Sequence, residues 1–226
     1  MDQEKAAAAG NNVGESLAFF IEKYRRIIIG VFIAAAVIVA GLAAGMGIRD
    51  SLEKRALSRL ELLIERYDAL RFSIADPEQA EAVEELLGEL AREARRSPGY
   101  AGARAWHLVA SMQADRKIWN EAEAAWKEAA RKAGKTYLAP VALFNAGAAA
   151  EEQGDAEGAA AYYDRASSYT DFPQAARALF SVGRLAEARE DGEAALAAYR
   201  KLIEGWPSTA WANLANSRII SLAGSE

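Results

Sequence analysis

Residues 122–129 read AEAAWKEA, and the same pattern returns as AAAYYDRA at residues 159–166 and as ALAAYRKL at residues 195–202. Each copy begins with alanine, carries an aromatic residue at its fifth position and ends with alanine or leucine. The copies are offset by 37 and 36 residues. Fixed spacings of this length are typical of chains built from stacked repeats of one small structural unit. The sequence therefore predicts a repeat fold.

The stretch before each copy repeats at the same two offsets. The aligned triplets are Trp106, Val109 and Ala110; Leu143, Ala146 and Gly147; and Leu179, Val182 and Gly183. Within each triplet the spacings of three and one residues place the side chains on one face of a helix. Since no apolar run of period two is long enough for a strand, we predict an all-α chain whose unit is a helix, a turn and a second helix.

The sizes of the repeated residues indicate how the units pack. Small residues at Ala110, Gly147 and Gly183 let the two helices of a unit cross closely, while the aromatic residue of the second helix fills the gap to the next unit. This order of large and small residues, closed by Pro207 in the third unit, resembles the tetratricopeptide repeat (TPR) pattern, although Pro173 stands two residues late in the second unit. The resemblance implies an α-solenoid of TPR-like helix-turn-helix repeats.

Helices before and after these copies are expected to complete the solenoid. We interpret the pair from Ser51 to Arg96 as a degenerate fourth unit, and the helix from Ser208 to Leu222 as the cover of the last apolar edge. The predicted segments are an N-terminal tail at 1–26, a transmembrane helix at 27–48, a juxtamembrane helix and degenerate helical pair at 49–99, and TPR repeats with a C-terminal capping helix at 100–226.

The predicted transmembrane helix is the stretch IIIGVFIAAAVIVAGLAAGMGI at 27–48, which contains no charged or strongly polar residue. A helix of this length reaches roughly 33 Å, enough for the ~30 Å hydrocarbon core of a bilayer. A cleaved signal peptide has a shorter apolar core of about 7–15 residues, so we favour a membrane span. The preceding residues 1–12, MDQEKAAAAGNN, have too little apolar surface to offset the cost of ordering, and we expect a loose tail there.

Charge near the span bears on its orientation. The basic residues there are Lys23, Arg25 and Arg26 before it and Arg49, Lys54, Arg55 and Arg59 after it. The cytoplasmic flank of a span usually carries more basic residues than the other flank, but here the two flanks carry similar numbers. The tighter group at 23–26 favours a cytoplasmic N-terminus.

Two features of the N-terminal region have alternative interpretations. Gly41 and Gly45 form a small-xxx-small pair that would let another membrane helix approach closely, but glycine is common in any span. An apolar stripe before the span is typical of a helix lying at the headgroup level, or of an early extension of the membrane helix. The residues of this stripe are Leu17, Phe20, Ile21 and Tyr24.

Composition excludes several classes of function. Acidic residues outnumber basic ones by 32 to 27, so the chain lacks the basic excess typical of nucleic-acid binding. Without cysteine there are no disulfides, thiolate metal sites or lipid attachment through cysteine. His107 is the only histidine, and no glycine-rich loop follows a strand. We therefore expect no enzyme, no cofactor and no metal site.

The TPR resemblance also implies a binding surface, because the first helix of each TPR unit lines the concave face of the solenoid. In this register the predicted peptide groove contains Arg104, His107, Phe144, Glu151, Arg177, Phe180 and Arg184. Two phenylalanines flanked by arginines suit an extended or helical peptide with apolar anchors and some acid. The alternative, that Phe144 and Phe180 are buried between units, stays open.

The layout as a whole resembles the bacterial single-span TPR proteins that are ancillary subunits of the Sec translocon. The shared features are aromatics at Phe19 and Phe20 before the span, an Ala/Gly/Val-rich span, a juxtamembrane helix and the entry YAGA at 100–103. Five tryptophans and the longer repeats depart from that family. The resemblance implies an inner-membrane protein with a cytoplasmic N-terminus and periplasmic repeats, which binds translocon subunits or a membrane-anchored periplasmic chaperone.

We accordingly predict a membrane-anchored protein–protein interaction module that takes part in protein translocation. The alternative is a structural scaffold for cell-division or cell-wall assembly proteins.

Overall fold

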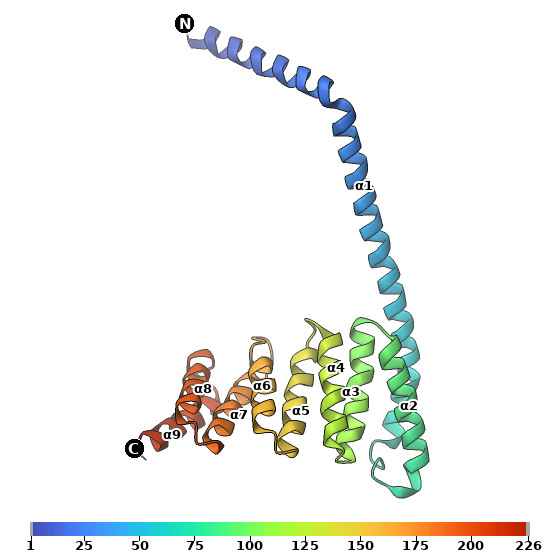
Figure 1. Cartoon of the computed structure of the whole chain (residues 1–226), viewed down its shortest axis with the longest axis vertical. Coiled ribbons are helices and arrows are strands. Elements are labelled where there is room, and N and C mark those ends of the chain that lie inside the picture. The colour runs from blue at the N-terminus through green and yellow to red at the C-terminus, as the bar shows by residue number, and fades with distance from the viewer. Residues whose placement is uncertain (1, 225–226) are drawn as a thin grey trace. The chain divides into compact units, whose positions relative to one another are not determined.

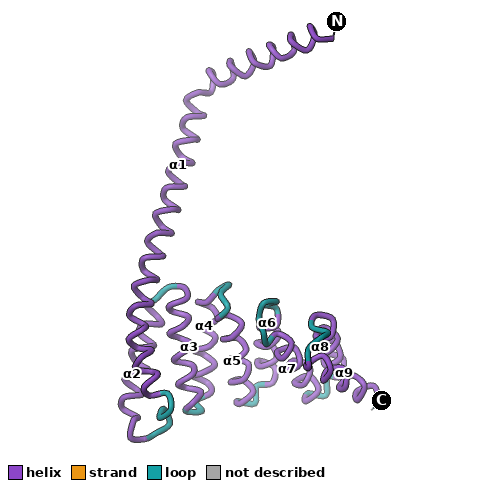
Figure 2. Tube along the Cα trace, turned by 180° about the vertical axis from the view of Figure 1, so that it is seen from behind, coloured by secondary structure: helices purple, strands orange, loops and turns teal. Residues whose placement is uncertain are grey.

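The computed structural model describes the backbone of residues 2–224 and the side chains of residues 22–27 and 29–224. Every regular element in this part of the chain is a helix, which confirms the all-α prediction (Figures 1 and 2). The elements are α1 (Asp2–Leu70), the 3₁₀ helix η1 (Pro77–Gln79), α2 (Ala80–Arg96), α3 (Gly99–Asp115), α4 (Trp119–Ala133), α5 (Leu138–Glu152), α6 (Ala156–Ser167), α7 (Ala175–Ala188), α8 (Gly192–Gly205) and α9 (Ala210–Ala223).

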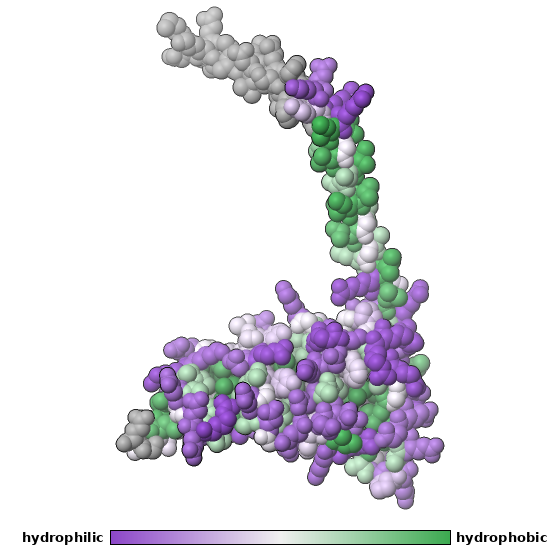
Figure 3. All heavy atoms as spheres, viewed as in Figure 1, coloured by the Kyte–Doolittle hydropathy of each residue, from purple (hydrophilic) through white to green (hydrophobic). Residues whose placement is uncertain are grey.

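The chain divides into two compact units, Met1–Ser51 and Leu52–Glu226. The first unit consists of the N-terminal part of α1, whose apolar stretch appears as a continuous band in Figure 3. The large apolar side chains described in this band are exposed; Phe32, for example, is 72% exposed. By length and composition alone, α1 is apolar enough to cross a membrane.

The structure differs from the expectation of a loose N-terminal tail, because α1 begins at Asp2. The run of alanines at 6–9 explains the difference, since alanine has the highest intrinsic helix propensity and needs no tertiary contact to favour helix. Of the predicted apolar stripe before the span, Leu17, Phe20 and Ile21 lie outside the residues whose side chains are described.

The second unit is the predicted solenoid. From α2 to α9 each helix packs against the next, and α3 also contacts α5 as α7 contacts α9 (Figure 1). We call α3, α5 and α7 the first helices of the three repeats and α4, α6 and α8 their second helices. The capping helix predicted at Ser208 to Leu222 is α9, where Thr209 accepts a hydrogen bond from the amide of Ala212 at 3.2 Å.

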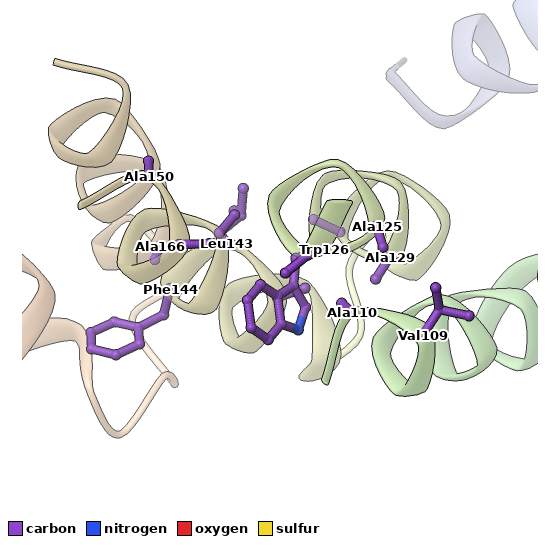
Figure 4. Packing of buried hydrophobic residues seen from close by; sticks show 14 of the residues in the cluster. Val109, Ala110, Ala125, Trp126, Ala129, Leu143, Phe144, Ala150 and Ala166 are labelled. Carbon is purple, nitrogen blue, oxygen red and sulfur yellow. The ribbon is translucent and has the colours of Figure 1, made fainter. Parts of the chain in front are cut away.

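Glycine and a large aromatic residue meet inside each of the last two repeats, whereas the aromatic residue was expected to fill the gap to the next unit. A Cβ added at Gly147 would lie 2.9 Å from Cε1 of Tyr163, and one added at Gly183 would lie 2.4 Å from Cε1 of Tyr199. The corresponding aromatic residue of the first repeat, Trp126, is 7% exposed and lies beside the first helix of its own repeat (Figure 4). The small residues therefore make room for the aromatic rings, and close helix packing follows.

The turn between the two helices of each repeat has the same backbone in all three copies. One residue in each turn has a left-handed conformation: Lys117 at φ 59°, Gly154 at φ 79° and Glu190 at φ 61°. The next amide donates to the carbonyl five residues back, as in the Schellman motif. These bonds run from Ile118 to Gln113, Asp155 to Ala150 and Asp191 to Ala186, at 2.9, 2.9 and 3.0 Å. Only the second repeat has glycine at this position, so the other two turns carry backbone strain.

Within the second unit, the last part of α1 is joined to α2 through a buried carboxylate. Glu93 is 4% exposed and accepts hydrogen bonds from Arg59, at 2.9 Å between Nη2 and Oε1, and from Ser97 and Arg96. Burial alone raises the pKa of Glu93, but these three donors outweigh it and lower the pKa to about 2. Glu53 adds a second link, because its Oε1 accepts the amide of Tyr100 at 2.8 Å. These contacts join the last part of α1 to α2 and α3, and the fourth unit of the solenoid stays a prediction.

Candidate interaction surfaces

The residues of the predicted peptide groove come from the three first helices. Arg104 and His107 lie on α3, Phe144 and Glu151 on α5, and Arg177, Phe180 and Arg184 on α7. Within each helix the spacing of these residues places them on one side, but several of them contact each other or a neighbouring helix. We call the side of α3, α5 and α7 that carries Arg104, His107, Arg177 and Arg184 the first-helix face.

Phe144 does not offer a free surface, which corrects its predicted role as a groove anchor. It is 7% exposed, and its ring centroid lies 5.1 Å from that of Tyr163 and 6.1 Å from that of Phe172. The guanidinium of Arg177 lies 5.1 Å from the ring centroid and stacks over it. The ring is buried because the loop after α6 folds back onto α5 and brings Phe172 against it.

Phe180 occupies the equivalent position one repeat later and is half-buried. Its ring centroid lies 5.5 Å from that of Tyr199 on α8 and 5.3 Å from that of Trp211 on α9. The ring therefore joins the third repeat to the terminal helix, and only part of it remains open to a partner.

Ion pairs join α5 to α7 and α7 to α9, and they include two more of the predicted groove residues. Arg184 pairs with Glu151 across α7 and α5, and Arg218 pairs with Glu187 across α9 and α7. Burial raises the pKa of Tyr199, and the hydrogen bond that its hydroxyl donates to Glu187 at 2.6 Å raises it further. Hydrogen bonds from Arg218 lower the pKa of Glu187, and burial only partly opposes them. Since these arginines are about half exposed, each pair contributes about 0–1 kcal/mol, so the pairs align the repeats more than they stabilise them.

His107 lies half-buried on α3, and burial lowers its pKa below the ordinary value. Its imidazole is therefore neutral at neutral pH. The Nδ1 atom is buried and, within the described part of the chain, has no hydrogen-bond partner. A neutral, inward-facing ring adds no charge to the first-helix face.

The remaining charge of the first-helix face is positive. Arg177 is exposed and Arg104 is half-buried, and Arg184 keeps about half of its surface open beside Glu151. Guanidinium groups on the first helices of the first and third repeats suit carboxylates on a partner. The face thus carries arginines from α3 and α7, and of the two phenylalanines predicted for the groove Phe144 is buried and Phe180 is half-buried.

The predicted membrane contact at Gly41 and Gly45 is not occupied by another helix in this single chain. A Cβ added at either glycine meets no atom within 4 Å among the described residues. Both positions are open along the apolar stretch of α1, so their role in helix association stays a prediction.

A hollow between two loops was not predicted. It measures about 630 Å³ and lies where the α4–α5 loop faces the α6–α7 loop. Its lining residues are Lys135, Thr136, Tyr137, Pro140, Val141, Ser168, Tyr169, Thr170, Asp171, Phe172, Pro173 and Gln174. Tyr137 at its edge also contacts Tyr100 on α3, since the two hydroxyls lie 2.6 Å apart.

Metal chemistry finds no support in the described side chains, among which no three His, Asp or Glu residues are grouped closely enough to hold an ion. The predicted absence of enzymatic activity and of a cofactor stays an expectation.

Comparison with known proteins bears on the family. No family model matches the chain. The chain is 35% identical over 222 residues to a "TPR repeat-containing protein" of Treponema pallidum (strain Nichols), and the match covers 90% of this chain and 92% of that protein. Among solved structures the chain is similar to the crystal structure of BtubC (BKLC) from P. vanneervenii, with a TM-score of 0.44 and 13% identity over 77% of this chain and 91% of that one. The extent and identity of the Treponema match, together with the observed helix-turn-helix repeats, show that the chain belongs to the TPR repeat-containing proteins.

Proposed function

We propose that this protein is a membrane-anchored interaction module, in which α1 is the anchor and the TPR solenoid binds proteins of the cell envelope at the secretion machinery. The observation that carries the proposal is the pairing of two units in one chain. One is a helix with an exposed apolar stretch of membrane-spanning length, and the other is a solenoid of three repeats with a terminal helix. TPR solenoids present extended surfaces for other proteins, and the anchor restricts the partners to the membrane surface.

The place of action follows from the resemblance to ancillary Sec translocon subunits and from the tight basic group at 23–26. In this proposal the N-terminus is cytoplasmic, the repeats lie outside the cytoplasm at the bacterial inner membrane, and translocon subunits or a periplasmic chaperone are the partners. Gly41 and Gly45 are then available for contact with another membrane helix, since both lie open along α1.

The partner contact proposed for the solenoid is the first-helix face. Arg104 is half-buried on α3 and Arg177 is exposed on α7, and both supply positive charge, while the ring of Phe180 is half-buried and offers a partly open apolar edge. A partner segment with carboxylates and one or two apolar side chains matches this surface. Binding through exposed charges is screened by salt, so capture should weaken as ionic strength rises.

Copurification from membranes tests the proposal. The full chain is extracted in mild detergent at low salt, and the proteins captured by the wild type are compared with those captured by the Arg104→Ala, Arg177→Ala double variant. Arg200→Ala, which removes an exposed arginine from α8, is the matched control. We expect translocon subunits to dominate the wild-type sample, to be lost with the double variant and to remain with the control. Capture of division or wall-assembly proteins instead would favour the scaffold alternative and refute the translocon role.

Thermal unfolding of the double variant separates loss of binding from loss of fold. Removing Arg177 uncovers one side of Phe144, so a small loss of stability is expected even where binding fails. A partner lost from a protein with a nearly unchanged Tm assigns the contact to the first-helix face. Retention of the partner by the double variant assigns it to another surface.

A further inference from the structure

The connections between helices carry opposite charge at the two ends of the solenoid. Because successive helices run in opposite directions, the α2–α3 and α4–α5 connections lie at one end, and the α5–α6 and α7–α8 connections lie at the other (Figure 1). Residues 95–100 and 131–137 contain five basic residues and no acidic one, whereas residues 151–157 and 187–193 contain eight acidic residues and one basic one. We call the first two segments the basic edge and the last two the acidic edge.

Three of the five cations on the basic edge have no carboxylate to neutralise them. Arg96 and Arg131 each form an ion pair with a glutamate of their own helix. Arg95 and Lys135 are exposed and have no carboxylate partner among the described side chains. The Nζ of Lys132 donates only to carbonyl oxygens, which leave its positive charge in place. The basic edge therefore keeps an unpaired positive charge.

Hydrogen bonds join the two connections of the basic edge into one surface. The Nζ of Lys132 reaches the carbonyls of Ser97 and Arg95 at 2.6 and 3.2 Å, and the hydroxyls of Tyr100 and Tyr137 lie 2.6 Å apart. The side chain of Tyr137 is 70% exposed beside these cations. An exposed tyrosine among basic residues is typical of a surface at the level of lipid headgroups.

The chain tethers the basic edge close to the end of the proposed membrane span. Glu53 follows Ile48 by five residues, and five residues reach at most about 18 Å. The Oε1 of Glu53 accepts the amide of Tyr100, which belongs to the basic edge, at 2.8 Å. The bilayer surface is thus always within reach of this edge, whereas an acidic protein would have to diffuse to it. Lipid headgroups are therefore the anionic surface that the observations favour.

We propose that the basic edge docks on anionic phospholipid headgroups of the membrane in which α1 is anchored. The inference rests on the proposed role of α1 as the anchor, but it needs neither a particular side of the membrane nor a named protein partner. Each unpaired basic residue at an anionic bilayer favours the docked state by about fivefold. The same bilayer repels the acidic edge, so the two edges select one orientation. The first-helix face runs between them and stays open to a partner.

Fluorescence quenching in nanodiscs tests the proposal. Because the chain contains no cysteine, Tyr137→Cys places a single NBD label on the basic edge, and Glu157→Cys places one on the acidic edge in a separate preparation. The full chain is reconstituted in discs of phosphatidylcholine alone or with about 30% phosphatidylglycerol, and the quencher is a nitroxide on the lipid headgroup. Quenching of the Tyr137→Cys label should be at least about twice as strong in the anionic discs and should fall at high salt. The Glu157→Cys label should show no such difference.

Charge variants locate the contact. In the Tyr137→Cys background, Arg95→Gln with Lys135→Gln should lower the ratio of docked to undocked solenoid by about 25-fold, so quenching returns to its level in neutral discs. The matched control is Lys117→Gln with Arg189→Gln, which removes the same charge from the opposite end of the solenoid and should leave quenching unchanged. Neither pair should alter the Tm appreciably, since all four side chains are exposed.

Three results would overturn the inference. They are equal quenching of the Tyr137→Cys label in neutral and anionic discs, equal quenching of the labels at both edges, and unchanged quenching in the Arg95→Gln, Lys135→Gln variant. Each of these leaves the proposed function standing, because coelution of the chain with the discs measures anchoring by α1 independently. A chain that enters neither kind of disc would overturn the proposed anchor, and this inference with it.

Discussion

Replacing Gly183 by alanine perturbs the repeat packing at its closest contact. The new Cβ would lie 2.4 Å from Cε1 and 2.7 Å from Cζ of Tyr199. The ring has nowhere to move, since Tyr199 is fully buried and its hydroxyl is bonded to Glu187 at 2.6 Å. Overpacking against a fixed neighbour costs about 3 kcal/mol, whereas alanine gains about 1 kcal/mol over glycine in helix propensity. The net loss of stability is about 2 kcal/mol.

Two further glycines make the experiment a graded series with its own control. At Gly147 the added Cβ would lie 2.9 Å from Cε1 of Tyr163, a milder clash, so Gly147→Ala should cost between about 0 and 1 kcal/mol after the same gain in propensity. At Gly88, inside α2, the nearest atom is a side-chain nitrogen of Arg92 at 3.7 Å, which is ordinary contact. Gly88→Ala should therefore stabilise the protein by about 1 kcal/mol.

Thermal unfolding of the full chain in detergent, followed by far-UV circular dichroism, measures the series. For a domain of about 150–250 residues, 1 kcal/mol shifts the Tm by about 2–4 °C. Gly183→Ala should lower the Tm by about 4–8 °C and Gly88→Ala should raise it by about 2–4 °C, with Gly147→Ala between them. An equal shift for Gly183→Ala and Gly88→Ala, or a higher Tm for Gly183→Ala, would refute the proposed fit of glycine to tyrosine.

Four further substitutions test other parts of the fold. Lys117→Gly and Glu190→Gly should each stabilise the protein by about 1 kcal/mol, because glycine adopts the left-handed backbone of the repeat turn without a Cβ clash; a lower Tm for both would argue against the observed turn. The pKa of Glu93 is about 2 in the folded protein against an ordinary value of 4.5, so the stability that its charge contributes is complete above about pH 4.5 and is lost as the pH falls toward 2. Glu93→Gln should accordingly cost about 3 kcal/mol in urea unfolding at neutral pH and almost nothing near pH 2, and a pH-independent difference would exclude the ionised form as the stabilising one. Phe144→Ala should lower the free energy of unfolding by about 3 kcal/mol or more, since the ring is buried between repeats. An unchanged free energy of unfolding would show that the ring is not buried.

The repeat architecture could be predicted because it leaves a periodic record in the sequence. Alanine and aromatic residues recur at fixed offsets, and Gly147 and Gly183 mark the places where tyrosine rings must fit. The short η1 at Pro77–Gln79, which precedes α2, lies outside this repeated pattern. Local helix propensity and side-chain packing favour the same structure at the repeated positions, and this agreement is why the sequence pattern predicts the fold.

The candidate site was predicted less well, because helical register gives the side of a helix but not what covers it. Phe144 lies on the expected side, yet Phe172 from a loop outside the repeated pattern packs against it. The left-handed residues of two repeat turns, Lys117 and Glu190, are not glycines, so the sequence does not indicate their left-handed backbone. The hollow at Tyr137 arises from two loops whose sequences do not match each other, so periodicity has no signal there.

The membrane topology of the solenoid tests the central claim most directly. A reporter that is active only after export is fused after Glu226 of the full chain, and a second copy of the reporter is fused before Met1 as the control. The account predicts an active C-terminal fusion and an inactive N-terminal one, both expressed at normal levels and both retained in the membrane fraction after alkaline washing. An inactive C-terminal fusion at normal expression, or release of the protein by the wash, would contradict an anchored solenoid outside the cytoplasm.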